Sequence, residues 1–349
     1  MVMFLIGVHV VCGTALLTRL FLLFRLQESL LLQVEQTFPV SENTGPTITA
    51  MKSAHMNWRT YWNPIQLLVE RQVSCLTDIV FYEDESVCLK LDLYKTVSSL
   101  KNAPVLLQIH GGGWSMGSRH HGIPLMVEMA TQGWLCVSIS YRLSPEVAFP
   151  EHLIDCKRAI RWIHEKGIEY GADPSSIFVV GESAGAHLAA LSALTPNMDE
   201  YQPGFEAVNT SLQGCVAFYG VYDFIAPFAK KTAYPALAQH LEQIVMQCSM
   251  SEHRIRFEKA SPVYCLEQGV VPFLLIHGEN DSMVPIEESL RFYHHLRKKQ
   301  ASFTTFLRLP LTQHGFDTLP SPVTQAVIPA VRQYLLQLRA TIQVHNNLS

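Results

Sequence analysis

A serine flanked by glycines two positions away on either side is the strongest chemical signal in this sequence. The segment Gly181–Gly185 reads Gly-Glu-Ser-Ala-Gly, follows the apolar run 177–180 and precedes a run typical of a helix. In this strand–turn–helix context the pattern lifts a nucleophilic hydroxyl onto a sharp turn, where the neighbouring side chains must be small or absent. The start of the following helix also directs positive dipole potential toward an oxyanion at the serine. We therefore predict that Ser183 is a catalytic nucleophile.

Three consecutive glycines could supply the oxyanion hole for this serine. The segment His110–Trp114 reads His-Gly-Gly-Gly-Trp and follows an almost wholly apolar run that begins at Ala103. Consecutive glycines let backbone amides point into one cavity, where they can donate to the oxyanion of a tetrahedral intermediate. A phosphate-binding loop is disfavoured because the Lys-Ser/Thr ending of a P-loop is missing. We expect the amides of Gly112, Gly113 and Ala184 to be the donors.

An acid and a base are expected after the serine in the chain, the acid first. Asp281 lies in a loop between an apolar run and a helix, and His314 lies just past another strand-like run. Histidine exchanges a proton near neutral pH, and a carboxylate fixes its tautomer and stabilises the imidazolium. We predict His314 as the base and Asp281 as its acid partner, with Glu279 as the alternative acid. His187 and His277 also lie near the motifs, and we interpret both as structural.

The elements that must position these residues alternate between strand and helix. From about residue 78, short apolar runs typical of buried strands alternate with segments of helical periodicity, and a helix near 323–338 closes the chain. This order predicts an α/β fold with a mostly parallel sheet and helices on both faces. Functional residues of such sheets gather at the carboxyl ends of the strands. Ser183, Asp281 and His314 all follow predicted strands.

Three further segments surround or interrupt this alternation. We predict a catalytic domain over 77–340, into which a helical lid is inserted at 223–264. Residues 27–76 are expected to form a linker or part of the lid, and residues 1–26 a hydrophobic anchor or a signal segment. The apolar run near the start is long enough to span a membrane if Arg19 extends its charge to the interface.

Two short signals disagree about the side of the membrane on which the catalytic domain would lie. Arg19 and Arg25 follow the apolar run and favour the cytosolic face by the positive-inside rule. The sequon Asn209–Ser211 can be glycosylated only in the secretory lumen. We expect a protein that associates with membranes through its N-terminal segment, in the endoplasmic reticulum or secretory pathway, with a luminal domain. The cytosolic face is the alternative.

Charge and cysteine content disfavour several functional classes. The 349 residues include 26 Lys and Arg against 30 Asp and Glu, and no basic stripe supports nucleic-acid binding. None of the eight cysteines forms a C-x-x-C pair, which disfavours zinc and thioredoxin-type sites, so we expect no metal and no cofactor. The sequence leaves open the oligomeric state and whether Cys75 pairs with Cys88, or Cys248 with Cys265.

These motifs together resemble those of the hormone-sensitive-lipase-like esterases, a group marked by an HGGG oxyanion loop. The resemblance rests on HGGGW, GESAG, the segment 141–150, the acid loop 281–285 and the HGF that begins at His314. It covers roughly 76–338, and the stretch 157–197 is most similar to bacterial carboxylesterases, including mycobacterial lipase-like proteins. The resemblance implies an α/β-hydrolase fold with an eight-stranded sheet, a helical lid, and hydrolysis of acyl esters without a cofactor.

Two positions depart from the pattern of the group. Glu182 stands where many members carry Asp, and the acid loop around Asp281 lacks the Asp-x-Leu-x-Asp of many deacetylase-like relatives. The second departure argues against transferring the substrate preference of those relatives to this chain.

The predicted reaction is hydrolysis of carboxylic esters through an acyl-enzyme on Ser183. We expect lipophilic, short-to-medium acyl chains, because the aromatic residues Phe218, Tyr219, Tyr222 and Phe224 would crowd a pocket near the serine. An amidase or formamidase is an alternative, since the same three residues serve both reactions. A non-catalytic scaffold on a hydrolase fold is a further alternative, although such proteins usually lose a catalytic residue.

Overall fold

The computed structural model describes residues 25–26, 29–34, 36–37, 68, 71–228, 234–266, 270–299, 303–318 and 321–348. The chain divides into two compact units, which are Met1–Trp58 together with Leu319–Ser349, and Arg59–Thr318. The larger unit contains the whole sheet and every residue predicted to take part in chemistry. In the smaller unit, the helix predicted near 323–338 is α11, Pro322–Leu348.

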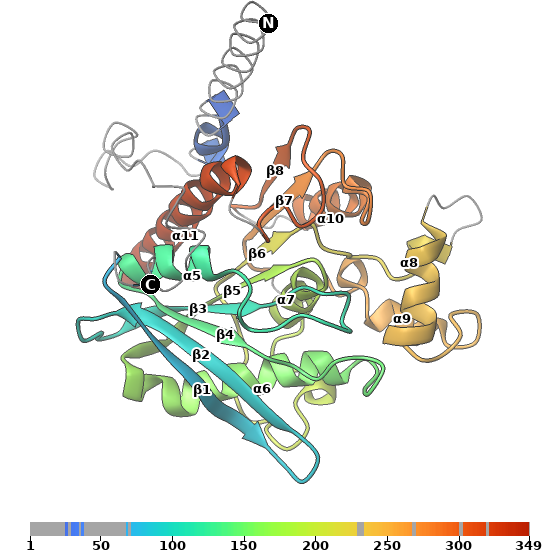
Figure 1. Cartoon of the computed structure of the whole chain (residues 1–349), viewed down its shortest axis with the longest axis horizontal. Coiled ribbons are helices and arrows are strands. Elements are labelled where there is room, and N and C mark those ends of the chain that lie inside the picture. The colour runs from blue at the N-terminus through green and yellow to red at the C-terminus, as the bar shows by residue number, and fades with distance from the viewer. Residues whose placement is uncertain are drawn as a thin grey trace, which may run out of the picture. The chain divides into compact units, whose positions relative to one another are not determined.

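Eight strands form one sheet in the order β1-β2-β4-β3-β5-β6-β7-β8 (Figure 1). β2 is antiparallel to both of its neighbours, and all other neighbouring pairs are parallel. The mostly parallel, eight-stranded sheet is therefore confirmed. The strands are β1 Val73–Glu83, β2 Cys88–Thr96, β3 Ala103–Ile109, β4 Leu135–Ile139, β5 Ala172–Glu182, β6 Gly214–Phe218, β7 Phe273–Gly278 and β8 Thr305–Leu309.

The inner strands explain why the sequence showed near-continuous apolar runs. Every residue of β3, β4, β6 and β7 is buried. A strand covered on both faces must place apolar side chains at successive positions, so that period-two alternation disappears. β5 extends this pattern to Glu182, which immediately precedes the serine at the strand's carboxyl end.

Helices cover both faces of the sheet, as expected. The side chains of α6, α7 and α10 share one apolar cluster with Leu107 of β3 and Val179 of β5. α5 begins beside the opposite face, because a side chain on Gly122 would meet Gln108 Nε2 at 2.6 Å and residues 107 and 108 face opposite sides. The other helix bounds are α5 Ile123–Thr131, α6 Glu151–Lys166, α7 Ala184–Leu194, α8 Pro235–His240, α9 Arg254–Lys259 and α10 Ile286–Lys298.

Two elements were not predicted from the sequence, and each lacks a clear local signal. β1 contains two register shifts against β2, and Asp78 within it has a φ of 62°, so its side chains do not alternate regularly between the faces. α5 begins after Gly122 without a side-chain cap, and Leu125 to Ala130 are all buried, which removes the polar face that marks an amphipathic helix.

The predicted lid segment 223–264 is helical but broken into short pieces. Besides α8 and α9 it contains the turns η3 Ala226–Phe228, η4 Leu241–Val245 and η5 Pro262–Tyr264, of which η4 is a π-helical turn. Among its described residues, α8 and α9 each have six residues. Its role as a lid stays a prediction.

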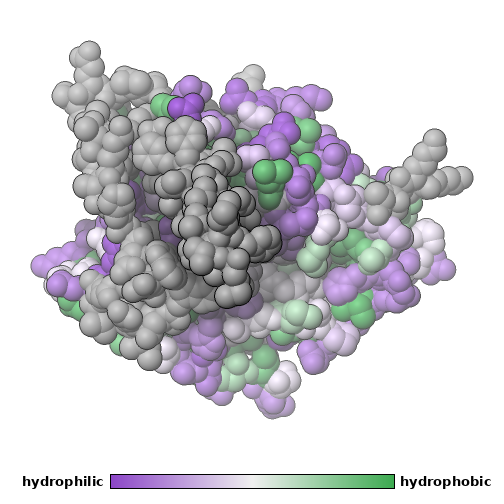
Figure 2. All heavy atoms as spheres, turned by 45° about the horizontal axis from the view of Figure 1, so that its top comes forward, coloured by the Kyte–Doolittle hydropathy of each residue, from purple (hydrophilic) through white to green (hydrophobic). Residues whose placement is uncertain are grey.

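The structure describes the cysteines considered for disulfides but almost none of the predicted membrane anchor. Within the described ranges, no helix combines the length and the apolarity needed to cross a membrane, and the predicted anchor lies outside those ranges apart from residues 25–26. Figure 2 shows one face of the molecule, on which hydrophobic residues lie in separate groups among hydrophilic ones. The cysteines of the described ranges are free thiols, so neither disulfide considered from the sequence is formed.

Candidate active site

Loops at the carboxyl ends of β5, β7 and β8 bring Ser183, Asp281 and His314 together. His314 Nε2 lies 3.0 Å from Ser183 Oγ, and His314 Nδ1 lies 2.6 Å from Asp281 Oδ2. A carboxylate only accepts hydrogen bonds, so Nδ1 carries the ring proton and Nε2 can accept from the serine hydroxyl. The side chain of Asp281 is 0% exposed and that of His314 is 11% exposed. The arrangement can therefore pass a proton from Ser183 to His314 in a largely dry environment.

The chain turns sharply at Ser183, and Gly181 and Gly185 leave the space that this turn needs. Ser183 has φ 54° and ψ −117°, a backbone conformation that residues other than glycine rarely adopt. A Cβ on Gly181 would lie 2.3 Å from the carbonyl oxygen of Gly185, and one on Gly185 would lie 2.0 Å from that of Ile109. The Ser183 amide donates to the carbonyl of Phe218 at 2.9 Å and holds the strained turn against β6.

The carboxylate of Asp281 is held in its charged form by donors on both oxygens. Its Oδ1 accepts from the amides of Met283 at 2.9 Å and Val284 at 2.8 Å. Its Oδ2 accepts from His314 and lies 3.2 Å from His277 Nε2. Burial alone would raise the pKa of Asp281, but the hydrogen bonds from the two histidines and from Val284 outweigh it and hold that pKa well below its usual value.

Glu279, considered as the alternative acid, and His277, interpreted as structural, both have other partners. Glu279, the alternative acid, pairs with Arg308 Nη2 at 2.9 Å. His277 contacts Ser289 Oγ at 2.7 Å, as a structural residue would. Its contact with Asp281 was missed in the sequence, where His277 lies inside a strand and nothing shows that its ring turns toward the acid loop.

The acid loop and the base loop are joined side by side. The amide of Asn280 donates to the carbonyl of Thr312 at 3.0 Å. The amide and hydroxyl of Ser282 donate to Gln313 Oε1 at 3.2 and 3.1 Å. Gly278 is needed at this junction, because a Cβ there would lie 2.3 Å from the Thr312 carbonyl oxygen. The backbones on either side of the Asp281–His314 contact are thus held in register.

The glycine loop presents amides that are available to an oxyanion. The carbonyl of Gly112 accepts from the amides of Ser115 at 3.1 Å and Met116 at 3.0 Å. Because a trans peptide is planar, the Gly113 N–H then points away from that turn. In the part of the chain that the structure describes, no carbonyl accepts from the amides of Gly112, Gly113 or Ala184. These are the three donors expected from the sequence.

Trp114 anchors the glycine loop to helix α7. Its Nε1 donates to His187 Nδ1 at 3.1 Å, and His187 Nε2 donates to the carbonyl of Ala260 at 2.7 Å. Burial lowers the pKa of His187 to about 3, so the ring stays neutral and can accept from Trp114. The structural interpretation of His187 agrees with these contacts.

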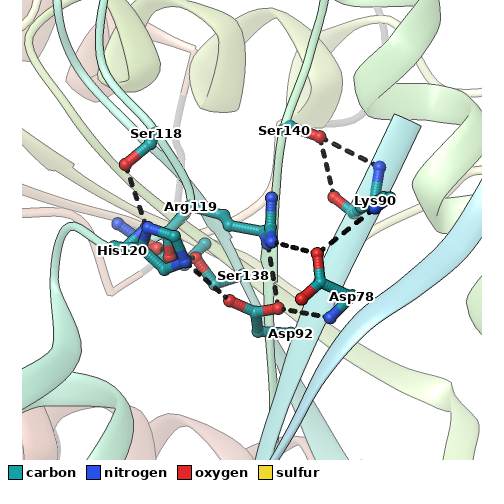
Figure 3. A network of polar contacts seen from close by, with 9 residues as sticks. Asp78, Lys90, Asp92, Ser118, Arg119, His120, Ser138 and Ser140 are labelled. Carbon is teal, nitrogen blue, oxygen red and sulfur yellow. Dashed lines mark hydrogen bonds and ion pairs between the residues drawn. The ribbon is translucent and has the colours of Figure 1, made fainter. Parts of the chain in front are cut away.

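The far end of the same loop is tied to β1 and β2 (Figure 3). Arg119 Nε donates to Asp92 Oδ1 at 2.9 Å, and Arg119 Nη2 donates to Asp78 Oδ1 at 2.8 Å. Asp92 is fully buried, and its Oδ2 lies 3.5 Å from His120 Nε2. A buried carboxylate needs a counter-charge. The ion pair between Arg119 and Asp92 therefore holds the end of the glycine loop against β2.

A row of buried polar side chains extends from Asp92 across the sheet to Glu182, the residue before Ser183. Asp92 is paired in register with Ser138, and Ser138 with Gln108. Ser138 donates to Gln108 Oε1, and Gln108 Nε2 lies 3.1 and 3.2 Å from the two carboxyl oxygens of Glu182. Burial, and then the nearby carboxyl of Asp317, raise the pKa of Glu182 to about 8. This shift favours the protonated form of the Glu182 carboxyl group.

Of the aromatic residues expected near the serine, Tyr219 contacts His314. Its ring centroid lies 4.5 Å from that of His314, and its hydroxyl donates to Asp317 Oδ1. Tyr222 and Phe224 are fully buried in the apolar core. Of the four aromatic residues expected to crowd a pocket near the serine, Tyr219 is thus the one in direct contact with the His314 ring.

Tyr141 and Arg142 lie beneath the site, as a scaffold would. The Tyr141 hydroxyl donates to the carbonyl of His110 at 3.0 Å, and its ring stacks on that of His110 with centroids 4.3 Å apart. Arg142 Nε donates to Asp155 of α6 at 2.8 Å. These contacts hold the strand end that leads into the glycine loop.

A cavity of about 450 Å³ lies between the predicted lid and α10. Its walls include Tyr234 and Leu237 on one side and Pro285, Leu290 and Arg291 on the other. The volume falls within the range of about 300–1,000 Å³ that is usual for small-molecule sites. The cavity adjoins the acid loop through Pro285, and Ser183 and His314 are not part of its lining. Across the described residues, no cluster of three His, Cys, Asp or Glu side chains is placed to hold a metal ion.

Known proteins with similar sequences and structures are esterases. The probable carboxylic ester hydrolase LipM of Mycobacterium tuberculosis is 42% identical over 240 residues, which are 68% of this chain and 55% of LipM. This chain thus spans a little more than half the length of that relative. The esterase of Thermogutta terrifontis with butyrate bound superposes with a TM-score of 0.64 at 21% identity, covering 76% of this chain and 94% of the esterase. The same esterase phosphonylated by sarin gives a TM-score of 0.66 at 21% identity, over 76% and 95%.

The family model named BD-FAE matches residues 91–296, which is more than half of the chain. The matched region begins in β2 and ends in α10, and so includes the glycine loop, the serine turn and the acid loop. This chain belongs to the BD-FAE family and has the α/β-hydrolase fold of the hormone-sensitive-lipase-like carboxylesterases.

Proposed function

We propose that this protein hydrolyses carboxylic esters through an acyl-enzyme on Ser183. The observation that carries the proposal is the line of hydrogen bonds from Ser183 Oγ through His314 to Asp281, at 3.0 and 2.6 Å. The available amides beside it and the esterase names of the relatives support the same reaction. A non-catalytic scaffold would have no need for a serine held at φ 54°.

In the acylation step His314 Nε2 takes the proton of Ser183 as Oγ attacks the ester carbonyl carbon. The oxyanion that forms accepts hydrogen bonds from the amides of Gly112, Gly113 and Ala184, which are stronger for the charged oxygen than for the ester carbonyl. The bond to the alcohol oxygen then breaks, and His314 returns its proton to the leaving alcohol. Asp281 stabilises the imidazolium during both transfers.

In the deacylation step a water molecule replaces the alcohol. His314 takes one proton from the water as its oxygen attacks the acyl carbon, and the same three amides stabilise the second oxyanion. The bond to Ser183 Oγ breaks, the proton returns to Oγ, and a carboxylic acid leaves. Each cycle therefore consumes one ester and one water and restores the resting enzyme.

Lipophilic esters with short-to-medium acyl chains are the substrates that we propose for this site. Three of its loops carry strongly exposed apolar side chains, which are Met116 at 65%, Met283 at 64% and Leu311 at 84%. Each belongs to a loop that carries an oxyanion donor, the acid or the base, so an apolar substrate would gain contacts as it approaches. Tyr219 beside His314 favours a limited chain length, and butyrate occupies the Thermogutta esterase.

The test combines active-site labelling with a substrate panel. The wild-type protein should react with a fluorophosphonate probe and should hydrolyse p-nitrophenyl esters, with kcat/KM rising with acyl length and then falling beyond medium chains. Ser183→Ala should abolish labelling and lower turnover by about 10⁴-fold or more. Ser98→Ala, an exposed serine between β2 and β3, is the matched control and should behave as wild type. Labelling that persists in Ser183→Ala, or faster turnover of aryl amides or formamides than of esters, contradicts the proposal.

We further propose that residues 1–26 attach the protein to a membrane and that the catalytic unit faces the secretory lumen. The support is the apolar sequence of that segment and the sequon at Asn209, whose side chain is exposed in the structure. The protein should sediment with membranes and show a glycosidase-sensitive mass that disappears in Asn209→Gln. Digestion of the domain by protease added outside intact microsomes would place it on the cytosolic face instead.

A further inference from the structure

A histidine on the short helix α8 reaches back to the glycine loop. His240 is the last residue of α8, and its Nε2 lies 2.7 Å from the carbonyl oxygen of Gly113. A Cβ on Gly113 would come within 3.3 Å of the same nitrogen, so the imidazole lies directly against the loop. Its ring centroid is 6.4 Å from that of Trp114. This contact joins two segments that are 127 residues apart.

The direction of this hydrogen bond follows from its partner. A carbonyl oxygen can only accept, so His240 Nε2 carries the proton and donates it. Both the neutral ring with its proton on Nε2 and the imidazolium can make the bond.

The loop needs a constraint at this point because its backbone is strained. Gly113 and Trp114 both have a φ of 59°, a left-handed conformation that is sterically disfavoured for Trp114. The peptide that links them could relax by rotating, since glycine offers little steric resistance. The carbonyl of this peptide is the group that His240 holds. On the far side, the Trp114 carbonyl accepts from the amide of Ser144 at 2.8 Å.

The base from which His240 extends is itself fixed in the core. α8 continues directly into the π turn η4, whose Leu241 and Val245 are fully buried. The amide of Phe149 donates to the carbonyl of Val245 at 2.9 Å and ties this turn to the segment after β4. A π turn is a rare element that often occurs at functional sites. Here it follows the residue that contacts the oxyanion loop.

We propose that His240 is a positioning residue that holds the Gly113–Trp114 peptide, and with it the amide donors of the oxyanion hole, in the geometry that catalysis uses. The inference rests on the proposed ester hydrolysis and assigns to α8 a part in it. Assembly of the oxyanion hole then depends on the seating of residues 235–245 against the glycine loop.

The kinetic signature of such a residue differs from that of a residue that only stabilises the fold. Oxyanion donors act mainly in the transition state, so their misplacement lowers kcat and leaves KM little changed. Removing a direct donor costs about 10²–10³-fold in kcat. Because His240 acts through the loop, we expect a loss of about tenfold in His240→Phe, which keeps the ring and removes the donor.

Conservative replacement provides the second half of the test. His240→Gln places an amide N–H near the position of Nε2 and should recover kcat to within about threefold of wild type, by the same reasoning about donors. Gln239→Ala alters the exposed neighbour on α8 and serves as the matched control. Kinetics with p-nitrophenyl butyrate, together with thermal unfolding of each variant, separate catalytic loss from loss of fold. Equal kcat in His240→Phe and wild type, or a change in KM alone, would overturn the inference.

Hydrogen exchange gives a readout that does not depend on the reaction. Mass spectrometry of deuterium uptake should show faster exchange over residues 111–117 in His240→Phe than in wild type, with other segments unchanged. If the wild-type protein hydrolyses no ester while His240→Phe still accelerates exchange there, the proposed function fails and the constraint on the loop stands. If exchange is unchanged in a variant that folds normally, His240 does not hold the loop and the inference fails, whatever the enzyme's activity.

Discussion

At the residue scale, the site is defined by which atoms can only donate and which can only accept. Asp281 accepts hydrogen bonds from two amides and from two imidazoles, and this set of donors keeps its carboxyl group charged. The fixed charge sets the tautomer of His314, which in turn leaves Nε2 to accept from Ser183. The proposed chemistry therefore rests on the carboxylate that contacts His314, and the neighbouring Glu279 pairs with Arg308 instead.

Exchanging each carboxylate for its amide distinguishes the two acids. Asp281→Asn should lower kcat by about 10³–10⁴-fold, because an amide can donate to Nδ1 and favour the wrong tautomer. Glu279→Gln is the matched control and should stay within about threefold of wild type, since a half-exposed ion pair with Arg308 contributes little. Steady-state kinetics with one p-nitrophenyl ester measure both. A severe loss in Glu279→Gln with a mild one in Asp281→Asn would reverse the assignment.

At the element scale, the glycine loop is held at several points by elements distant in sequence. α7 holds it through His187, β1 and β2 hold it through Arg119, and α8 contacts it through His240. A loop rich in glycine has large conformational freedom, so an oxyanion hole built on it needs such external contacts. The Arg119 contact differs from the others because it also neutralises a buried charge (Figure 3).

Removing that counter-charge should destabilise the fold. Arg119→Met leaves Asp92 buried at 0% exposure without its cation, and we expect a loss of about 3 kcal/mol in the free energy of unfolding. The double variant Arg119→Met with Asp92→Asn removes both charges, keeps an acceptor for the Asp78 amide and should recover most of the loss. Urea denaturation measures each value. Equal stability of the single and double variants would show that the buried charge is not the cause.

At the scale of the whole unit that contains the sheet, one face of the sheet carries a row of buried polar side chains through an apolar interior. It begins at Asp92 on β2 and passes through Ser138 and Gln108 to Glu182 on β5. Burial and Asp317 raise the pKa of its last member, Glu182, to about 8, which favours the protonated carboxyl group. The stability of the unit should therefore depend on pH in a region where most proteins are insensitive.

Glu182→Gln tests this dependence. A carboxyl group whose pKa is raised by folding stabilises the fold while it is protonated. The contribution of Glu182 is complete below its ordinary pKa of 4.5 and is lost as the pH rises through about 8. The wild-type protein should thus lose stability between pH 6 and 9, and Glu182→Gln, which keeps an acceptor for Gln108, should lose less. Urea unfolding at both pH values measures the difference. Identical losses in the two proteins would mean that Glu182 is already ionised in the folded state.

The sequence by itself determined the features that depend on local pattern. Near-continuous apolar runs predicted the buried strands, and the glycines around Ser183 predicted a turn whose steric reason the structure confirms. The proximity of Asp281 and His314 could be predicted because each lies in the loop after a strand, and the carboxyl ends of parallel strands meet at one edge of a sheet. β1 and α5 were missed because their burial patterns carry no clear period.

Only the tertiary structure decided which distant residues hold the site in place. His277 turns toward Asp281, Arg119 reaches Asp92, and His240 donates to Gly113 across 127 residues of chain. None of these pairs has a signal in sequence spacing, because the packing of whole elements sets the distance between them. A side chain can donate only to a group that the fold has already brought within about 3 Å. The local pattern thus indicates the reacting groups, and the packing of elements determines their geometry.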